Sequence, residues 1–161
     1  MILKEHLIDL MLNSCPSFGP VLDKMKELDR SLYYCVAGCF VGHLEELYKQ
    51  QDTEVFSEVA KMIESFLVEG DSFVRDFATV GILEGMQNCR SDNFDTYIFQ
   101  NHLLPKSKKQ WNELNIFWEK VGRAQQNKID KYYRDLTIEA EGYFSYILSV
   151  IKRFLLGKWI N

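Results

Sequence analysis

The sequence predicts an all-α protein, and three features of its 161 residues support that fold class. Apolar residues recur at spacings of three and four, while no segment of useful length alternates between polar and apolar residues. Three prolines and nine glycines are few for a strand-and-turn architecture of this length. A hydrophobic fraction of 47% and an aromatic fraction of 14% are ample for a packed core, which excludes a disordered chain. We therefore expect one helical domain over residues 1–161.

Residues 1–12 are predicted to form an amphipathic helix, because charged residues interrupt the apolar ones at helical spacing. The same interruptions argue against the continuous apolar core of a signal peptide. Pro16 and Pro20 mark residues 13–20 as a turn, and a short helix is expected over residues 21–28.

A longer helix is predicted up to about Lys49, with Ser31 as its N-cap. Its apolar face is expected to carry Leu32, Cys35, Val36, Cys39, Phe40, His43, Leu44 and Leu47. Asp52 is the expected cap of the following helix, which ends at Gly70.

Asp71, directly after Gly70, is expected to cap a further helix that extends to about Gln87. Because hardly any loop separates these two helices, they should fold back on each other as an antiparallel pair. The buried face of the second helix is expected to carry Phe73, Val74, Phe77, Val80 and Gly81. Gly81 and Gly85 lie inside this helical pattern and match no phosphate-binding motif, so they indicate close helix packing.

The C-terminal part of the chain begins with a short amphipathic segment over residues 94–102, ended by Pro105. Ser107 is the expected cap of a helix that ends at Gly122 and carries Trp111, Leu114, Phe117, Trp118 and Val121. One or two helices are expected over residues 123–159. Successive helix pairs favour either an α-solenoid of the HEAT or armadillo kind or an irregular helical bundle.

The most apolar stretch, Tyr143 to Leu156, contains Lys152 and Arg153 and is too short to span a bilayer. We therefore expect a cytoplasmic protein without a membrane partner. In that compartment reduced thiols are expected at the four cysteines, Cys15, Cys35, Cys39 and Cys89.

The spacing Cys35-x3-Cys39-x3-His43 places three potential metal ligands on one helical face. Neighbouring members could share a metal, but the outer pair lies about 12 Å apart along the axis, too far to bind one zinc together. Burial of modest-sized side chains on a core-facing stripe explains the same spacing. Since the histidines stand outside recognised catalytic motifs, we expect no metal, no other cofactor and no enzymatic activity.

Charge is distributed unevenly, because residues 1–100 sum to −9 and residues 101–161 sum to +5 in a chain of net charge −4. The negative charge of residues 1–100, called the acidic body, favours a basic protein partner and argues against direct binding of nucleic acid. Acidic helices also keep proteins soluble, and the sequence leaves both explanations open. The candidate partner contacts are Glu64, Glu69, Asp76 and Glu84. Glu84 stands in an otherwise apolar run, so its carboxylate either caps a neighbouring helix or faces a binding groove.

Three stretches carry a resemblance to a known family: residues 63–74 (IESFLVEGDSFV), 78–88 (ATVGILEGMQN) and 104–111 (LPKSKKQW). With Phe117 and Trp118, they resemble small helical bacterial proteins, some of which are similar to immunity proteins of polymorphic-toxin and contact-dependent growth-inhibition systems. The resemblance covers residues 30–122, and residues 123–161 depart from it as a C-terminal helical extension. It implies no catalytic residue.

The resemblance implies an immunity protein that binds a cognate toxin, expected to be a basic nuclease domain delivered by contact-dependent inhibition, and occludes its active site. The acidic body fits this expectation, because it could mimic nucleic acid toward a nuclease. Two other classes remain open. One is a helical-repeat regulatory scaffold with a different protein partner. The other is a metal- or ligand-binding helical domain that uses Cys35, Cys39 and His43.

Overall fold

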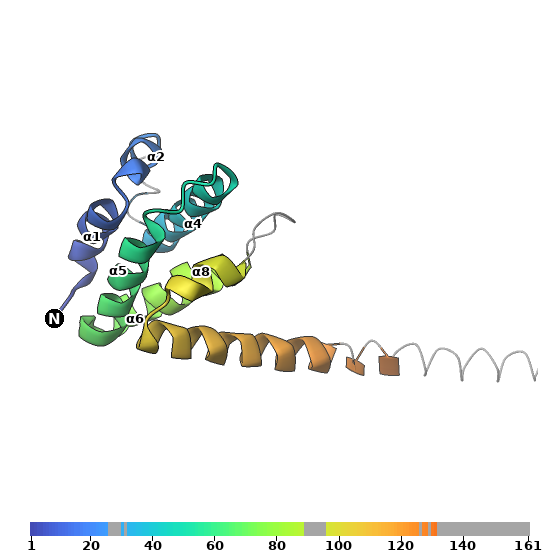
Figure 1. Cartoon of the computed structure of the whole chain (residues 1–161). Helices are drawn as coiled ribbons and strands as arrows, with labels where there is room; N and C mark the ends of the chain where they lie inside the picture. Colours follow the sequence, from blue (N-terminus) through green and yellow to red (C-terminus); the bar gives the residue numbers. More distant parts are fainter. Residues whose placement is uncertain (26–29, 31, 89–95, 126, 129, 132–161) are drawn as a thin grey trace, which may run out of the picture. The chain divides into compact units, whose positions relative to one another are not determined.

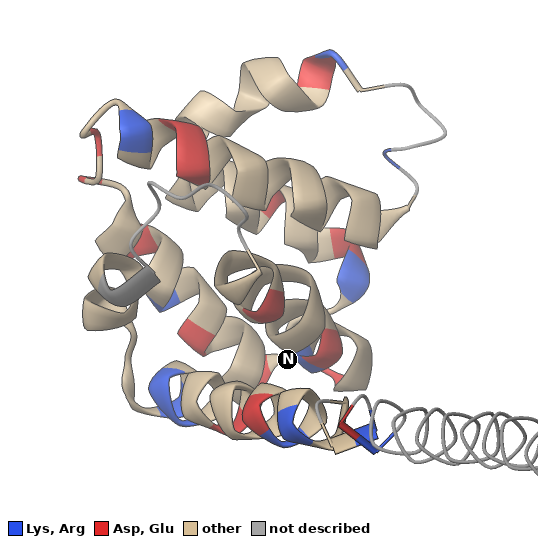
Figure 2. Cartoon of the chain, turned by 90° about the vertical axis from the view of Figure 1, so that its right-hand side faces the viewer, with Lys and Arg blue, Asp and Glu red and all other residues tan. Residues whose placement is uncertain are grey.

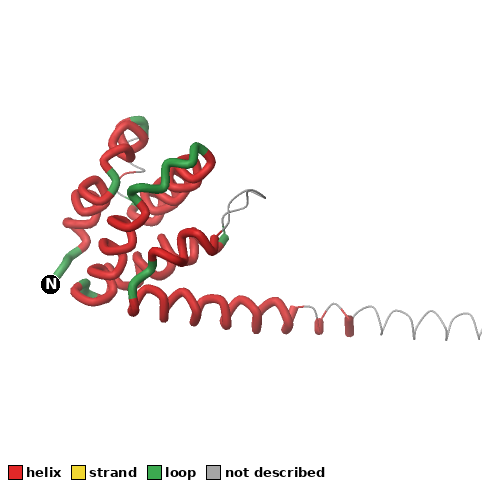
Figure 3. Tube along the Cα trace, in the orientation of Figure 1, coloured by secondary structure: helices red, strands yellow, loops and turns green. Residues whose placement is uncertain are grey.

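The computed structural model is helical, which confirms the all-α fold class (Figure 1, Figure 3). It describes residues 1–25, 30, 32–88, 96–125, 127–128 and 130–131. Within these ranges the only extended pairing is a bridge between Ile2 and Gly70. Across the same ranges, each helix is too short or too polar to cross a membrane.

The chain divides into two compact units, Met1–Asn115 and Ile116–Asn161, and each is described by itself. The elements labelled in Figure 1 belong to the first unit. Every described residue of the second unit is helical, and most of the expected extension 123–161 lies outside the described residues. The expectation of one domain stays a prediction.

The N-terminal region consists of η1 (Lys4–His6), α1 (Leu7–Ser14), η2 (Pro16–Phe18) and α2 (Gly19–Asp23). The sequence predicts Pro16 and Pro20 as breakers, but each lies in the first turn of a helical element. Proline is tolerated there because the amide hydrogen it lacks would have no partner inside the helix. The helix expected over residues 21–28 therefore begins earlier, and residues 26–29 lie outside the described part of the chain.

α4 (Tyr33–Lys49) is the predicted long helix, but its buried face is rotated from the predicted one. Its buried residues are Val36, Ala37, Phe40, Val41, Leu44 and Leu47. Leu32 and Cys35 are exposed instead, while Cys39 and His43 are half-buried. Leu32 occupies the N-cap position without a side-chain hydrogen bond, and the expected cap, Ser31, lies outside the described residues.

Gly81 and Gly85 explain this rotation, because they bring the neighbouring helical run close to α4. A Cβ atom on Gly81 would lie 3.0 Å from Ala37 Cβ, and one on Gly85 would lie 3.1 Å from Val41 Cγ2. The predicted close helix packing is therefore confirmed. The close approach of the two helices places Ala37 and Val41, rather than Cys35, in the core.

α5 (Phe56–Glu69) begins later than predicted, because Asp52 closes the end of α4 instead of capping α5. The Asp52 amide donates to Leu47 O at 2.9 Å, and Val55 is the residue at the N-cap of α5. The buried face of α5 consists of Phe56, Val59, Ala60, Met62, Ile63, Phe66 and Leu67.

The connection after α5 follows the prediction closely. Gly70 is the C-cap of α5, and Asp71 is the N-cap of the next helix, with its Oδ1 accepting a hydrogen bond from Val74 N at 2.9 Å. The helical run then consists of α6 (Ser72–Asp76), η3 (Phe77–Leu83) and α7 (Glu84–Gln87). Both α6 and η3 pack against α5, and the rings of Phe66 and Phe77 lie 6.3 Å apart.

The π-helical geometry of η3 changes which residues of this run are buried. Each residue of a π-helix advances less around the axis than a residue of an α-helix, so the apolar face shifts. Val80 is predicted to be buried but is 50% exposed, whereas Ile82 and Leu83 are fully buried.

α8 (Thr96–His102) precedes a helix over residues 105–125, called the Trp111 helix. Ser107 lies inside its first turn rather than at the N-cap, and Ser107 Oγ accepts a hydrogen bond from Leu104 N at 3.0 Å. The helix continues past its predicted end at Gly122, since an interior glycine costs only about 1 kcal/mol. Its exposed apolar side chains are Ile116, Phe117, Trp118 and Val121.

Helices of the first unit contact both their neighbours in sequence and more distant helices. Among the distant contacts, α1 packs against α5, α4 packs against η3 and α7, and α5 packs against α8. In a solenoid each repeat would contact its neighbours in sequence order. Of the two predicted arrangements, these contacts favour the irregular bundle.

Candidate functional site

The carboxylate of Glu64, one of the expected partner contacts, is engaged inside the protein. Its Oε1 accepts a hydrogen bond from Lys106 N at 2.8 Å, and its Oε2 accepts from Ser107 N and Ser107 Oγ, both at 2.7 Å. Burial would raise the pKa of the Glu64 carboxyl, but these hydrogen bonds and the Lys106 charge outweigh it and lower the pKa. Glu64 thus caps the first turn of the Trp111 helix, a role that the sequence offered for Glu84.

Glu64→Gln is expected to lower the free energy of unfolding by about 1 kcal/mol near neutral pH, because the charged cap is lost. The folded-state pKa lies below the unfolded value, so the carboxylate contributes fully above the unfolded pKa and loses that contribution as pH falls through the folded pKa. Urea unfolding at neutral and acidic pH should therefore show a smaller acid-induced loss in Glu64→Gln than in the wild type. Glu58→Gln, on the exposed face of the same helix, is the control, and equal acid sensitivity in all three proteins would contradict this role.

The other three candidate carboxylates lie on three different elements. Glu69 is the last residue of α5, Asp76 the last of α6, and Glu84 the first of α7. Glu69 and Asp76 are exposed, while Glu84 is half-buried. Within the described residues none of the three forms a salt bridge, so Glu69 and Asp76 are available to a partner.

Residues 45–84, called the acidic stretch, contain ten Asp and Glu against three Lys and Arg, a net charge of −7. Figure 2 shows the Asp and Glu positions of the described chain in red and the Lys and Arg positions in blue. All three cations have partners within this stretch. Lys49 pairs with Glu45 and Glu46, Lys61 pairs with Glu58, and Arg75 Nη1 donates to Gly70 O at 2.6 Å. Each cation thus has a partner within the chain although its side chain is exposed, and carboxylates outnumber cations on α5 and α6.

His43 pairs with a serine rather than with the cysteines of its own helix. Ser17 Oγ and His43 Nε2 lie 2.9 Å apart, and Cys15 Sγ lies 3.4 Å from Ser17 Oγ. Burial lowers the pKa of His43, which keeps the ring neutral, and burial raises the pKa of the Cys15 thiol despite hydrogen bonds from Ser17 and Phe18 that would lower it. Sequence reasoning missed Ser17 because 26 positions separate it from His43.

A second serine–histidine pair has the same form. Ser57 Oγ lies 2.9 Å from His102 Nδ1, and the His102 ring packs 5.9 Å from Phe56, just as the His43 ring packs 5.9 Å from Phe18. Within the described residues, no three His, Cys, Asp or Glu side chains form a group that could hold a metal ion. We interpret both histidines as packed against aromatic rings at helix contacts.

A pocket of about 660 Å³ opens where α4 ends, and sequence reasoning did not anticipate it. Among the described residues, its lining consists of Tyr48, Lys49, Gln51, Thr53 and Ile98. Four of them come from the end of α4 and the loop after it, and Ile98 comes from α8. Only the fold joins these segments, so no local sequence pattern could have identified the pocket.

Gln51, in the pocket lining, has a left-handed backbone conformation with φ of 62°. Gln51 N donates to Tyr48 O and Asp52 N donates to Leu47 O, both at 2.9 Å, which are the two hydrogen bonds of a Schellman motif. Glycine is the usual residue at this position because it lacks the Cβ that is unfavourable at positive φ. The left-handed backbone conformation is thus unfavourable for Gln51, and the Gln51 side chain lines the pocket.

Gln51→Gly is expected to raise the free energy of unfolding by about 0.5–1 kcal/mol, because glycine relieves the left-handed conformation. Chemical denaturation of the two proteins measures the change. Gln50→Gly is the matched control, since Gln50 has a negative φ of −82° and should lose stability on the same substitution. A destabilised Gln51→Gly protein would contradict the strain assigned here.

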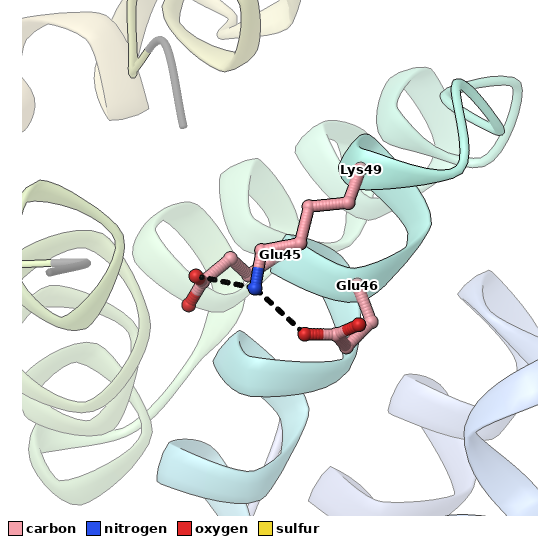
Figure 4. Close-up of polar contacts among 3 residues, drawn as sticks. All are labelled: Glu45, Glu46 and Lys49. Carbon is pink, nitrogen blue, oxygen red and sulfur yellow. Dashed lines mark hydrogen bonds and ion pairs between the residues drawn. The ribbon is translucent and has the colours of Figure 1, made fainter. Parts of the chain in front are cut away.

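Lys49 is held at the edge of the pocket by two carboxylates of α4 (Figure 4). Lys49 Nζ lies 2.8 Å from Glu46 Oε1 and 3.1 Å from Glu45 Oε1. The hydrogen bonds to Glu46 and then Glu45 raise the pKa of Lys49, so the ammonium stays charged. The group of three side chains carries a net charge of −1 and does not attract an anion.

Comparison with protein families places the chain in one of them. The model of the family described as Domain of unknown function (DUF7674) matches residues 8–119, more than half of the chain, so the protein belongs to this family. No curated protein and no solved structure matches the chain.

Proposed function

We propose that this protein is an immunity-type protein that binds a cognate basic toxin domain, such as a nuclease, and neutralises it by covering the active site. The observation that carries the proposal is the acidic stretch, with its net charge of −7 and its three cations already engaged. The resemblance of residues 63–74, 78–88 and 104–111 to immunity-type proteins points in the same direction.

Charge complementarity explains how such a surface would act. A nuclease binds a polyanion through Lys and Arg side chains, so its active-site surface is basic. A carboxylate-rich surface is attracted to the same side chains, which accelerates association and selects the partner. A bound immunity protein would then exclude the nucleic acid substrate from that surface.

The position of Glu69 gives independent support for a binding role. Glu69 is exposed and lies at the C-terminal end of α5, where a negative charge opposes the helix dipole. A lysine at this position would favour the helix by about 0.3–1 kcal/mol. A carboxylate that disfavours its own helix is better explained by a partner than by stability.

The experiment that tests the proposal is a growth assay in which the C-terminal domain encoded directly upstream is expressed with and without this protein. We expect growth to stop when the domain is expressed alone and to recover when both are expressed. If the domain is harmless, or its toxicity is not relieved, the immunity proposal fails. A regulatory scaffold with another protein partner would then be the better explanation.

Charge reversal of the acidic stretch should weaken this protection. Glu69→Lys with Asp76→Lys is expected to weaken toxin binding about tenfold or more while changing stability by less than about 1 kcal/mol. The matched control is Glu5→Lys with Asp9→Lys, which reverses two exposed carboxylates outside the stretch. Calorimetric titration measures both affinities, and equal weakening by the two double variants would contradict a role for the acidic stretch.

A further inference from the structure

We infer that the pocket lined by Tyr48, Lys49, Gln51, Thr53 and Ile98 receives an arginine side chain of the bound protein. This inference rests on the proposed function, because it names the group of a basic partner that the site would hold. It specifies a docking point on α4, α8 and the loop between α4 and α5, outside the four carboxylates identified from the sequence.

The local charge selects a cationic group. Residues 45–54 contain Glu45, Glu46, Asp52 and Glu54 against the single cation Lys49, a net charge of −3. Lys49 is already bound to two of these carboxylates. Lys49 is the charged side chain of the described pocket lining, and these surrounding carboxylates outnumber it, so the local charge favours a cation over an anion.

The lining residues suit a guanidinium more closely than a simple ammonium. Gln51 and Thr53 supply side-chain oxygens that can accept hydrogen bonds, and the planar guanidinium carries five donors in a fixed fork. Tyr48 is an aromatic residue on which a guanidinium can stack. Ile98 offers apolar contact to the methylene groups of an arginine side chain.

The openness of the pocket favours a side chain of a protein over a free small molecule. Lys49, Gln51 and Ile98 are all exposed, so the pocket is open to solvent. Small-molecule sites bury most of their ligand, which this pocket could not do alone. A side chain that projects from a protein surface would be covered from the other side by its own protein.

The conformation of Gln51 indicates that the pocket has a use. Its φ of 62° is a conformation that glycine adopts more readily, and the Schellman hydrogen bonds do not require a side chain there. Strained residues persist where function needs their side chains. The Gln51 side chain lines the pocket, and a glycine at position 51 would lack it.

The test is an NMR titration of the ¹⁵N-labelled full chain with acetyl-glycyl-arginyl-glycinamide. The control peptide contains citrulline, which keeps the shape of arginine without its charge. We expect saturable shifts at the amides of residues 48–53 and 98 with the arginine peptide, about fivefold weaker binding in Gln51→Gly, and unchanged binding in Gln50→Gly. The absence of shifts at these amides, equal shifts with the citrulline peptide, or undiminished binding in Gln51→Gly would overturn the inference.

This titration uses no toxin, so its outcome is separate from that of the growth assay. Arginine binding in the pocket without growth protection would leave the pocket assignment standing while the immunity proposal fails. Growth protection without arginine binding would support the immunity proposal and contradict the inference that the pocket receives an arginine.

Discussion

Gly70→Ala is expected to lower the free energy of unfolding by about 3 kcal/mol or more, because no space exists for a Cβ atom at this position. That atom would lie 2.5 Å from Val74 Cγ1 and 2.8 Å from Val74 Cβ, and it would collide with the backbone oxygen of Phe66. A backbone oxygen within the last turn of a helix cannot move aside as the end of a flexible side chain can.

The connection around Gly70 also joins the N-terminal residues to α5 and α6. Ile2 N donates to Glu69 O at 2.9 Å, Asp71 N donates to Ile2 O at 3.0 Å, and Arg75 Nη1 donates to Gly70 O at 2.6 Å. Any displacement of Gly70 would strain all of these hydrogen bonds together.

Gly38→Ala is the matched control for this variant. Gly38 lies on the exposed side of α4, and apart from its chain neighbours and the backbone of its own helix no atom lies within 4 Å of the position that its Cβ would take. Alanine favours an exposed helix interior by about 0.5–1 kcal/mol over glycine, so thermal unfolding should show a gain in stability. If Gly70→Ala and Gly38→Ala have similar melting temperatures, the packing described around Gly70 is wrong.

Trp111→Ala is expected to cost about 3–5 kcal/mol of the free energy of unfolding, because it removes a large buried side chain. Trp111 is 2% exposed, its ring lies 6.3 Å from that of Phe99, and its backbone oxygen accepts a hydrogen bond from Gln87 Nε2 at 2.9 Å. It therefore joins the start of the Trp111 helix to α7 and α8.

Trp118→Ala removes the same side chain seven positions further along the same helix. Trp118 is 38% exposed, so we expect a loss below about 1 kcal/mol. Urea unfolding followed by circular dichroism compares the two variants. Equal losses would contradict the burial assigned to Trp111.

The features that the sequence predicted correctly depend on local interactions. Gly70 and Asp71 were identified because a C-cap and an N-cap act within one turn of their own helices. The positions of α4 and α5 followed from apolar residues at three- and four-residue spacing. Gly81 and Gly85 were correctly assigned to close packing because little else explains glycine in an apolar helix.

The errors arise where the backbone departs from the expected helix geometry or where a distant residue takes over a capping role. Asp52 resembles a helix cap, but its amide is used to close α4. Val80 fits an α-helical stripe, but η3 is π-helical and turns it outward. Ser107 resembles an N-cap residue, but the helix already begins at residue 105, and Ser107 Oγ accepts a hydrogen bond from Leu104 N. The carboxylate oxygens that cap the first turn belong to Glu64.

The sequence predicts the negative charge of the candidate site but not its geometry. The excess of carboxylates over residues 45–84 is visible in the sequence. Glu69 and Asp76 are two of the four candidates predicted from it, but their exposure is seen only in the fold. The internal role of Glu64 and the pocket beside Gln51 both depend on segments more than 40 positions apart. Such proximity follows from the bundle, and no spacing in the sequence encodes it.

The most direct test of the account is an activity titration with the purified upstream-encoded toxin domain. Its activity on nucleic acid would be measured at increasing concentrations of this protein, at low and at high salt. We expect complete inhibition near equimolar protein, with an apparent affinity that falls as salt screens the acidic stretch. Undiminished toxin activity at a large excess of this protein, in low salt, would contradict the claim that this protein neutralises a basic partner.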